Sequence, residues 1–216
     1  MSAPAAEDRA LVAAMLARDP AGLDGAYRRY AARLHAYSRT LLADGDAAND
    51  VVHDTFLIAS ERVAQLREPD RFGAWLYAIA RSECLRRLRL RRRTAPIEDD
   101  LPPPGDGTDP GRAVQAAEVR ALVRAAAAGL NDGDREVIEL AIRHDLAAGE
   151  IASVLGVSAN HAHARLSRAR GQLEAALGAL LVARGGAGRC AELDQLLAGW
   201  DGRLTALWRK RIHRHV

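Results

Sequence analysis

The sequence is poor in lysine and in aromatic residues. Lys210 is its only lysine, although lysine and arginine together number 31, and aromatic side chains make up 4% of the 216 residues. Because alanine and leucine dominate the apolar residues, an all-α fold of close-packed helices is expected, with almost no strand. Nearly every basic side chain is a guanidinium group, which binds phosphate and guanine in a planar, bidentate way.

Cysteine and long apolar runs are also scarce. Cys84 and Cys190 lie far apart, and neither belongs to a Cys-x-x-Cys pair or to an obvious zinc-ligand spacing. No apolar run approaches membrane-spanning length, and the first ten residues lack the basic-then-apolar order of a signal peptide. We therefore expect a reduced, cytoplasmic protein with no metal site and no membrane insertion.

Charge is spread unevenly along the chain, although the formal net charge is only +3. The basic cluster holds Arg81, Arg86, Arg87, Arg89, Arg91, Arg92 and Arg93, and the acidic cluster that follows holds Glu98, Asp99, Asp100, Asp106 and Asp109. Basic clusters bind polyanions through phosphate contacts and counterion release. The alternative is a solvated helix end whose arginines offset the helix dipole, but seven arginines exceed what a helix end needs.

The first 94 residues show the apolar periodicity of four helices. One lies within 7–17, a second within 23–42, a third is expected to be capped by Asp46, and the fourth carries Trp75 into the basic cluster. Residues 95–112 are rich in proline, glycine and aspartate, which disfavour both a helix and a core. We interpret this segment as an interdomain linker.

A second helical domain is expected over residues 113–184. Its first helix ends at Gly129, and the next runs from Arg135 to His144 with Asp132 or Asp134 as its cap.

The rest of this domain has the pattern of a helix-turn-helix. A short helix over 146–155 is followed by a turn at Gly156, and Ser158 is expected to cap a helix from Ala159 to about Leu181. In such motifs the second helix enters the major groove of DNA. Its inner face is predicted to be Ala162, Leu166, Ala169 and Leu173.

Residues 185–216 form an extension. A glycine-rich joint leads into one amphipathic run that contains Trp200 and Trp208 and ends in basic residues. The run either covers a domain or binds a partner. We predict no metal site in it.

Three segments are more specific together than any one is alone. They are DAANDVVHDTFLIA at 46–59, RFGAWLYAIARSECLRRLR at 71–89 and GEIASVLGVSANHAHARLSRAR at 149–170. Together they resemble bacterial RNA polymerase sigma factors of the sigma-70 family, extracytoplasmic-function group, over Tyr27 to about Leu177. His53, Ser82 and His163 depart from the residues common in that group.

The resemblance implies a division of the chain. Residues 1–94 would be region 2, which docks on the polymerase and recognises and melts the −10 element. Residues 95–112 would be the acidic linker, and residues 113–184 would be region 4, whose helix-turn-helix reads the −35 element. Residues 185–216 remain an extension without an assigned role.

The resemblance also implies site residues. The polymerase-binding set is Asp46, Asn49, Asp50, His53, Asp54 and Phe56. The −10 set is Arg71, Phe72, Tyr77, Arg81, Ser82, Arg86 and Arg89, which combines aromatic rings and arginines as single-stranded DNA requires. The −35 set is Asn160, His161, His163, Arg165, Ser167 and Arg168.

The predicted function is therefore promoter recognition for RNA polymerase, with no catalytic residues and no cofactor. Asp50 and Asp54 lie at i, i+4, but no phosphate loop or nucleophile with a base accompanies them, which favours a docking face over a catalytic site. His161 and His163 point to different helix faces, so they cannot share a metal ion.

The expected partners are the β′ clamp helices and the β flap of core RNA polymerase, promoter DNA and an anti-sigma factor. Two alternatives remain open. One is a stand-alone helix-turn-helix regulator that does not bind polymerase, and the other is a helical adaptor that binds a partner through Trp200 and Trp208.

Overall fold

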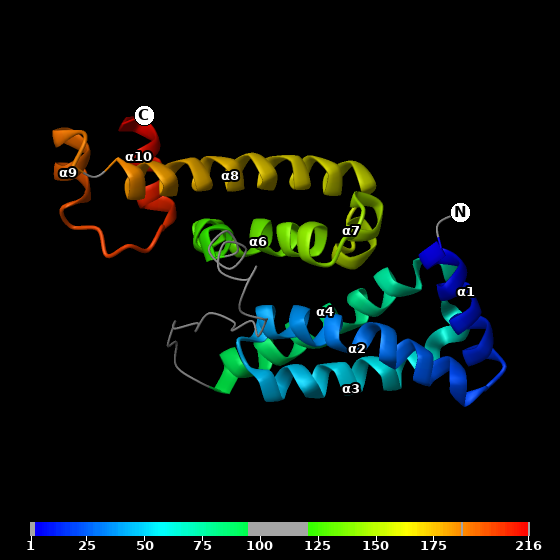
Figure 1. Cartoon of the computed structure of the whole chain (residues 1–216). Helices are drawn as coiled ribbons and strands as arrows, with labels where there is room; N and C mark the ends of the chain where they lie inside the picture. Colours follow the sequence, from blue (N-terminus) through cyan, green and yellow to red (C-terminus); the bar gives the residue numbers. More distant parts are fainter. Residues whose placement is uncertain (1–2, 95–120, 187, 216) are drawn as a thin grey trace, which may run out of the picture. The chain divides into compact units, whose positions relative to one another are not determined.

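The computed structural model describes residues 3–94, 121–186 and 188–215, and all structural statements below concern this part of the chain. Every regular element in it is helical, which confirms the expected all-α fold (Figure 1). The N-terminal elements are α1 (Ala3–Leu16), α2 (Pro20–Leu42), α3 (Gly45–Arg62), the short 3₁₀ turns η1 (Val63–Gln65) and η2 (Pro69–Arg71), and α4 (Phe72–Thr94). The later elements are α6 (Asp132–Ile138), η3 (Glu139–Arg143), α7 (Ala148–Leu155), α8 (Ala159–Gly185), α9 (Ala191–Leu197) and α10 (Ala206–His215).

The chain divides into two compact units, which we describe separately. The first comprises Met1–Gly105 and His144–Ala162, and the second comprises Asp106–Arg143 and His163–Val216. The expected linker at 95–112 falls outside the described residues, so the domain boundaries inferred from the sequence stay predictions.

Aspartates fix where α2 and α3 begin. Asp19 accepts a hydrogen bond from the Ala21 amide at 2.9 Å, and Pro20 occupies the first helical position, where its missing N–H costs nothing. At α3 the expected cap, Asp46, is wrong. Asp44 has the extended backbone of an N-cap and accepts from the Ala47 amide at 3.0 Å, while Asp46 lies in the first turn.

The core of the first unit is built from α2, α3 and α4. Leu34 and Tyr37 of α2, Val51 of α3 and Leu76 of α4 are each at most 1% exposed. Burying such side chains contributes about 1.5–3 kcal/mol each. The half-buried Trp75 lies at the edge of this core, with its ring centroid 6.1 Å from that of Phe72.

A buried carboxyl ties α1 to this core. Asp8 Oδ1 accepts the Tyr30 hydroxyl at 2.5 Å, and Asp8 Oδ2 accepts the Gly73 amide at 3.3 Å. A Cβ at residue 73 would lie 2.9 Å from the Tyr30 hydroxyl oxygen, so glycine is required there for close approach. Burial raises the pKa of Asp8 despite these hydrogen bonds, and burial also raises the pKa of Tyr30.

In the second unit, the cap of α6 differs from the expected one. Asn131, and neither Asp132 nor Asp134, caps α6, because its side chain accepts from the Asp134 amide at 2.9 Å. Residues 121–127 are also helical. Arg135 donates to the carbonyls of residues 127, 128 and 130, which satisfies the C-terminal end of that helical segment. The predicted helix over 135–144 is therefore displaced, and its last part, η3, is a π-helix.

The helix-turn-helix pattern agrees with the structure. Gly156, which ends α7, has φ +67°, a conformation that glycine adopts without strain. Ser158 Oγ accepts from the His161 amide at 3.3 Å, which confirms the predicted cap of α8. The predicted inner residues, Ala162, Leu166, Ala169 and Leu173, are all buried.

The C-terminal run is two helices, α9 and α10, instead of one. Gly202 has φ +85°, and Trp200 Nε1 donates to the Arg203 carbonyl at 2.9 Å, so the chain turns between them. Leu193, Leu204 and Ile212 are the buried residues of this segment. None of the described helices is both long and apolar enough to cross a membrane.

The buried carboxyl of Asp8 makes a testable contribution to pH dependence. Its folded-state pKa lies above 3.8, the ordinary value that the unfolded chain keeps. Between these two pKa values the carboxyl is ionised in the unfolded chain but still protonated in the folded protein. The free energy of unfolding therefore falls as pH rises through this range. Urea unfolding of the wild type and Asp8→Asn from about pH 4 to about pH 7 should show the variant gaining relative stability as pH rises. A difference that stays constant over this range would contradict the assignment.

Candidate functional site

The predicted polymerase-binding residues lie along α3. Asp46, Asn49, Asp50 and His53 are exposed, and Asp54 is half-buried. Phe56 is only 5% exposed, and its ring centroid lies 5.0 Å from that of Tyr27 on α2. The structure therefore places Phe56 in the packing between helices, where it positions α3 and offers little surface to a partner.

Arg87 of α4 joins this acidic face to the basic helix. Its Nη1 donates to Asp50 Oδ2 at 3.0 Å, and its Nη2 donates to Asp54 Oδ2 at 2.7 Å. Burial lowers the pKa of Arg87, but the hydrogen bonds to the two carboxylates outweigh it and hold the pKa above its usual value. One guanidinium thus bridges two successive turns of α3.

A second arginine extends the same contact. Arg91 donates to Asp44, the cap of α3, and to the Leu42 carbonyl at 3.4 Å. The Ala47 amide, and then Arg91, lower the pKa of Asp44. The sequence predicted that Arg87 and Arg91 bind nucleic acid. In the structure Arg87 binds Asp50 of α3, and Arg91 binds Asp44, the N-cap of α3.

Of the predicted −10 residues, some lie on the surface and others lie in the core. Arg71, Ser82, Arg86 and Arg89 are exposed and Arg81 is half-buried, all on α4 or the turn before it.

Phe72 is fully buried and packs edge-on against Tyr30, while Tyr77 is 1% exposed and packs edge-on against Tyr37. A base can stack only on an exposed ring face. In this structure neither ring is open to a base.

His144 completes the aromatic cluster around Tyr77. Its Nδ1 lies 2.8 Å from the Tyr77 hydroxyl, its carbonyl accepts from Arg33, and it is 2% exposed. The sequence indicated only a helix end at this position. A lone histidine beside a charged residue gives no signal that it will be buried among aromatic rings.

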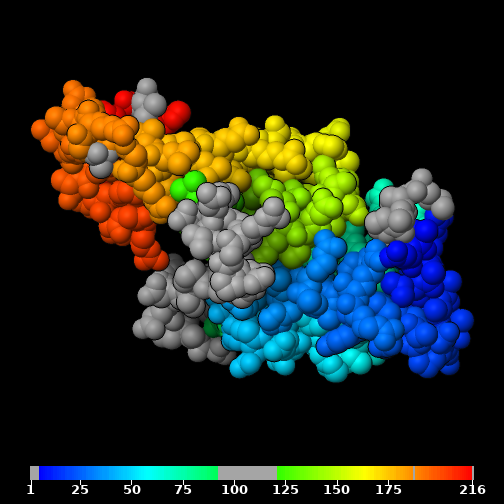
Figure 2. Space-filling model, viewed as in Figure 1, coloured from blue at the N-terminus to red at the C-terminus, as the bar shows by residue number. Residues whose placement is uncertain are grey.

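The predicted −35 residues lie on α8, whose side chains form a continuous exposed strip in Figure 2. Asn160, His161, His163, Ser167 and Arg168 are exposed and Arg165 is half-buried. His161, Arg165 and Arg168 are spaced i, i+4, i+7, so they share one helix face.

Arg165 lies over the start of α6. A Cβ at Gly133 would stand 2.1 Å from its Nη2, so glycine leaves room for this guanidinium.

No three-ligand metal cluster of histidine, cysteine, aspartate or glutamate occurs among the described residues. Cys190 Sγ and His215 Nε2 do lie 3.4 Å apart, and His215 Nδ1 lies 3.9 Å from Glu192. Such a pair lacks the three or four ligands that a protein zinc site uses.

The Arg87 bridge can be measured by a double-mutant cycle. Because Arg87 is 21% and Asp54 33% exposed, we expect Arg87→Gln and Asp54→Asn to couple by about 1 kcal/mol, within the range for screened ion pairs. Denaturant unfolding of both single variants and the double variant gives the coupling.

The matched control for that cycle is Arg86. Its Nη2 lies 3.9 Å from Asp54 and its side chain is 51% exposed, so the Arg86→Gln and Asp54→Asn cycle should show almost no coupling. Equal coupling in both cycles would mean that Arg87 has no special role in holding α3 to α4.

Comparison with known proteins gives consistent matches along the chain. Residues 26–94 match the family described as Sigma-70 region 2, and residues 120–173 match Sigma-70, region 4. The ECF RNA polymerase sigma factor SigM of Mycobacterium tuberculosis is 31% identical over 175 residues, which cover 80% of this chain and 86% of SigM. The RNA polymerase sigma factor CnrH of Cupriavidus metallidurans is 31% identical over 186 residues, covering 82% and 97% of the two chains.

Solved structures are similar as well. CnrH in complex with the cytosolic domain of CnrY superposes with a TM-score of 0.56 at 28% identity, covering 80% of this chain and 97% of that one. The sigma factor RpoE in complex with the anti-sigma factor NepR from Bartonella quintana gives 0.55 at 24% identity, covering 73% and 98%. The second likeness supports the fold alone.

Proposed function

Because the chain belongs to the extracytoplasmic-function group of the sigma-70 family, whose members direct RNA polymerase to specific promoters and are not enzymes, we propose how its surfaces divide that work. The observation that carries the proposal is the Arg87 bridge between α3 and α4. It links the acidic helix α3 to the basic helix α4, so α3 can bind polymerase while α4 contacts DNA.

Polymerase binds the exposed face of α3. Asp46, Asn49, Asp50 and His53 present carboxylate, amide and imidazole groups to a partner, and Asp54 stands at the edge of this face. The β′ clamp helices are the partner that the family implies for this face. Phe56 supports the face from behind, so a substitution there would act through folding.

The basic side of α4 and the turn before it bind the −10 element. Arg71, Arg86 and Arg89 are exposed and supply phosphate neutralisation, and Ser82 supplies a hydroxyl that can contact a base edge. Arg81 lies half-buried in the same helix. Phe72 and Tyr77 are left out of this surface because both rings are buried.

The −35 element is read by the N-terminal half of α8. The shared face of His161, Arg165 and Arg168 enters the major groove, and Asn160, His163 and Ser167 flank it. Region 4 of the family further implies the β flap of polymerase as a partner. We place this activity in the cytoplasm, where bacterial polymerase and chromosome lie.

An anti-sigma factor is proposed as a regulatory partner. The similar solved structure at 28% identity is a complex of the sigma factor CnrH with the cytosolic domain of CnrY. A protein that covers the acidic face of α3 would block polymerase binding directly.

The function is tested by transcription with purified components. The full chain and bacterial core polymerase are incubated with duplexes that carry randomised upstream boxes, and the RNA is sequenced. We expect transcripts from templates that share two boxes at fixed spacing. DNA binding without polymerase pull-down would instead favour a stand-alone regulator. Pull-down without any promoter-dependent RNA would contradict the proposed function.

The docking face is tested with Asn49→Ala combined with His53→Ala. Both side chains are exposed, so the fold should be kept, while affinity for core polymerase should fall about tenfold or more, a loss of roughly 1.4 kcal/mol. Binding is measured by fluorescence anisotropy of the labelled chain. The control is Asp24→Ala with Arg28→Ala, an exposed ion pair on α2, and an equal loss in that control would refute a local docking site.

Arg168→Ala tests the −35 surface. If Arg168 binds phosphate, the salt dependence of promoter binding by the holoenzyme should decrease by about one counterion. If it reads a base, discrimination at one position should weaken by about 1–3 kcal/mol. Unchanged affinity and unchanged base preference would remove Arg168 from the site.

A further inference from the structure

The C-terminal helix α10 carries a concentration of positive charge that the promoter-binding surfaces above do not use. Residues 202–215 contain five cationic side chains and no aspartate or glutamate: Arg203, Arg209, Lys210, Arg211 and Arg214. The match to sigma-70 region 4 ends at residue 173, so this helix lies beyond the segment that matches region 4.

The fold turns these charges outward. Leu204 and Ile212 are buried and anchor the segment, while Lys210, Arg211 and Arg214 are exposed. The Arg211 guanidinium lies over the Trp208 ring at 5.3 Å from its centroid, a contact that leaves its N–H groups available. In the part of the chain that the structure describes, no carboxylate lies within ion-pairing distance of Lys210, Arg211 or Arg214.

Arg209 fixes α10 to one side of α8. Its Nη1 donates to Gln172 Oε1 at 3.3 Å, and Gln172 in turn donates to Asp134 Oδ2 at 2.9 Å. Gln172 follows Arg168 by one helical turn, about 6 Å along the axis, and follows Arg165 by two turns. The basic helix therefore joins α8 on the side that carries both proposed DNA-binding arginines.

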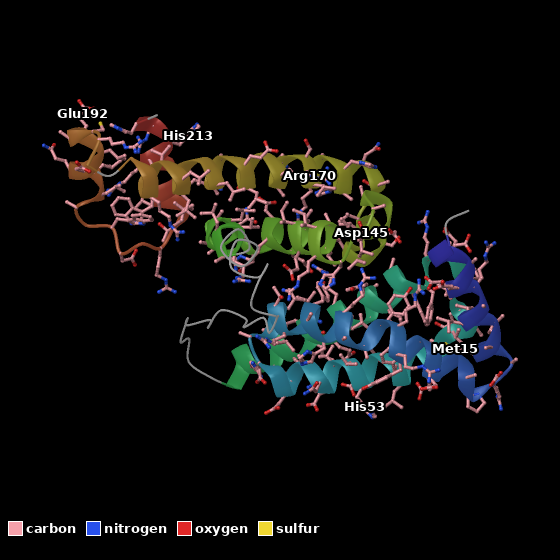
Figure 3. All side chains as sticks on the ribbon, viewed as in Figure 1. Met15, His53, Asp145, Arg170, Glu192 and His213 are labelled. Carbon is pink, nitrogen blue, oxygen red and sulfur yellow. The ribbon has the colours of Figure 1, made fainter. Side chains whose placement is uncertain are left out.

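In Figure 3, His213 of α10 lies near the C-terminal part of α8, whereas Arg170 lies farther toward the middle of that helix. Arg168 is exposed on α8, and α10 adds exposed cations on the side of α8 that carries Arg168 and Gln172. Duplex DNA carries one negative charge per about 1.7 Å of its axis, so a basic surface that extends along a recognition helix meets further phosphates.

We propose that α10 binds the DNA backbone next to the −35 element and extends the contact made by α8. The inference rests on the proposed major-groove role of α8. It assigns Lys210, Arg211 and Arg214 to phosphate contacts that add affinity without reading sequence. Nonspecific attraction of this kind also speeds the search for a promoter.

DNA suits this surface better than a lipid bilayer does. A helix that lies in a membrane interface needs an apolar face directed at the lipid. In α10 Ile212 is buried within the protein, and Leu207 is the exposed large aliphatic side chain of this helix. The continuity with α8 also favours a polyanion that already touches that helix over an acidic protein.

The test uses the full chain and a fluorescein-labelled 30-base-pair duplex of arbitrary sequence, with anisotropy measured over a series of NaCl concentrations. The variant is Lys210→Gln, Arg211→Gln and Arg214→Gln together. We expect the slope of log K against log [NaCl] to become less steep by about two to three, since each lost phosphate contact accounts for about 0.9. Affinity at the lowest salt should fall at least tenfold.

The matched control removes the same charge elsewhere. Arg18→Gln, Arg62→Gln and Arg67→Gln together delete three exposed arginines of the first unit, and the slope should change by less than about one. An unchanged slope in the α10 variant, or equal changes in both variants, overturns the proposal. So does loss of binding to phosphatidylglycerol vesicles, or to core polymerase, without any change in duplex binding.

The two proposals fail in different ways. If the wild-type chain gives no promoter-dependent RNA with core polymerase, the proposed function fails even when the slope changes. If the wild type transcribes and only the α10 variant leaves the salt dependence unchanged, the inference about α10 fails and the function stands. Thermal unfolding of the α10 variant shows whether Ile212 and Leu204 still anchor the helix.

Discussion

The double hydrogen bond from Arg87 to Asp50 and Asp54 is the interaction that joins the two proposed binding helices of the first unit. It crosses from α4 to α3 and satisfies two carboxylates that would otherwise repel each other one turn apart. Because both partners remain partly exposed, its desolvation cost is moderate. The bridge sets the register of two helices that carry opposite charge on their outer faces.

The few aromatic residues of the first unit lie mostly in its core. Tyr30, Tyr37, Phe56, Phe72 and Tyr77 are all buried, so the aromatic content supports the core of the first unit. Contact with nucleic acid then falls to arginine, which binds phosphate and base edges in the same geometry. α8 shows the same division of residue types: its inner face is alanine and leucine, and its outer face carries arginine and histidine.

Much of this architecture follows from the sequence. Apolar spacing predicted the helices, Gly156 and Ser158 marked the helix-turn-helix, and the three motifs together indicated the sigma-70 family. The cap of α3 was missed because Asp44 and Asp46 flank the same glycine, and only the backbone of Asp44 is extended. The turn at Gly202 was missed because its left-handed φ leaves no mark on the apolar pattern.

The site residues were harder to place. Periodicity shows that α4 has an apolar stripe, but it does not show how wide the buried face is, and Tyr77 falls inside it. Arg87 meets partners 33 and 37 residues away, and no local rule distinguishes such an arginine from one that faces solvent. Tertiary packing decides both cases.

The central claim is that polymerase binds the exposed face of α3, and site-specific cross-linking tests it most directly. A photoreactive benzoylphenylalanine replaces His53 on that face, and in a second protein it replaces Arg28 on α2. After mixing with core polymerase and irradiation, the account predicts a cross-link to the β′ subunit from position 53 and none from position 28. No cross-link from position 53, or equal cross-links from both positions, would contradict it.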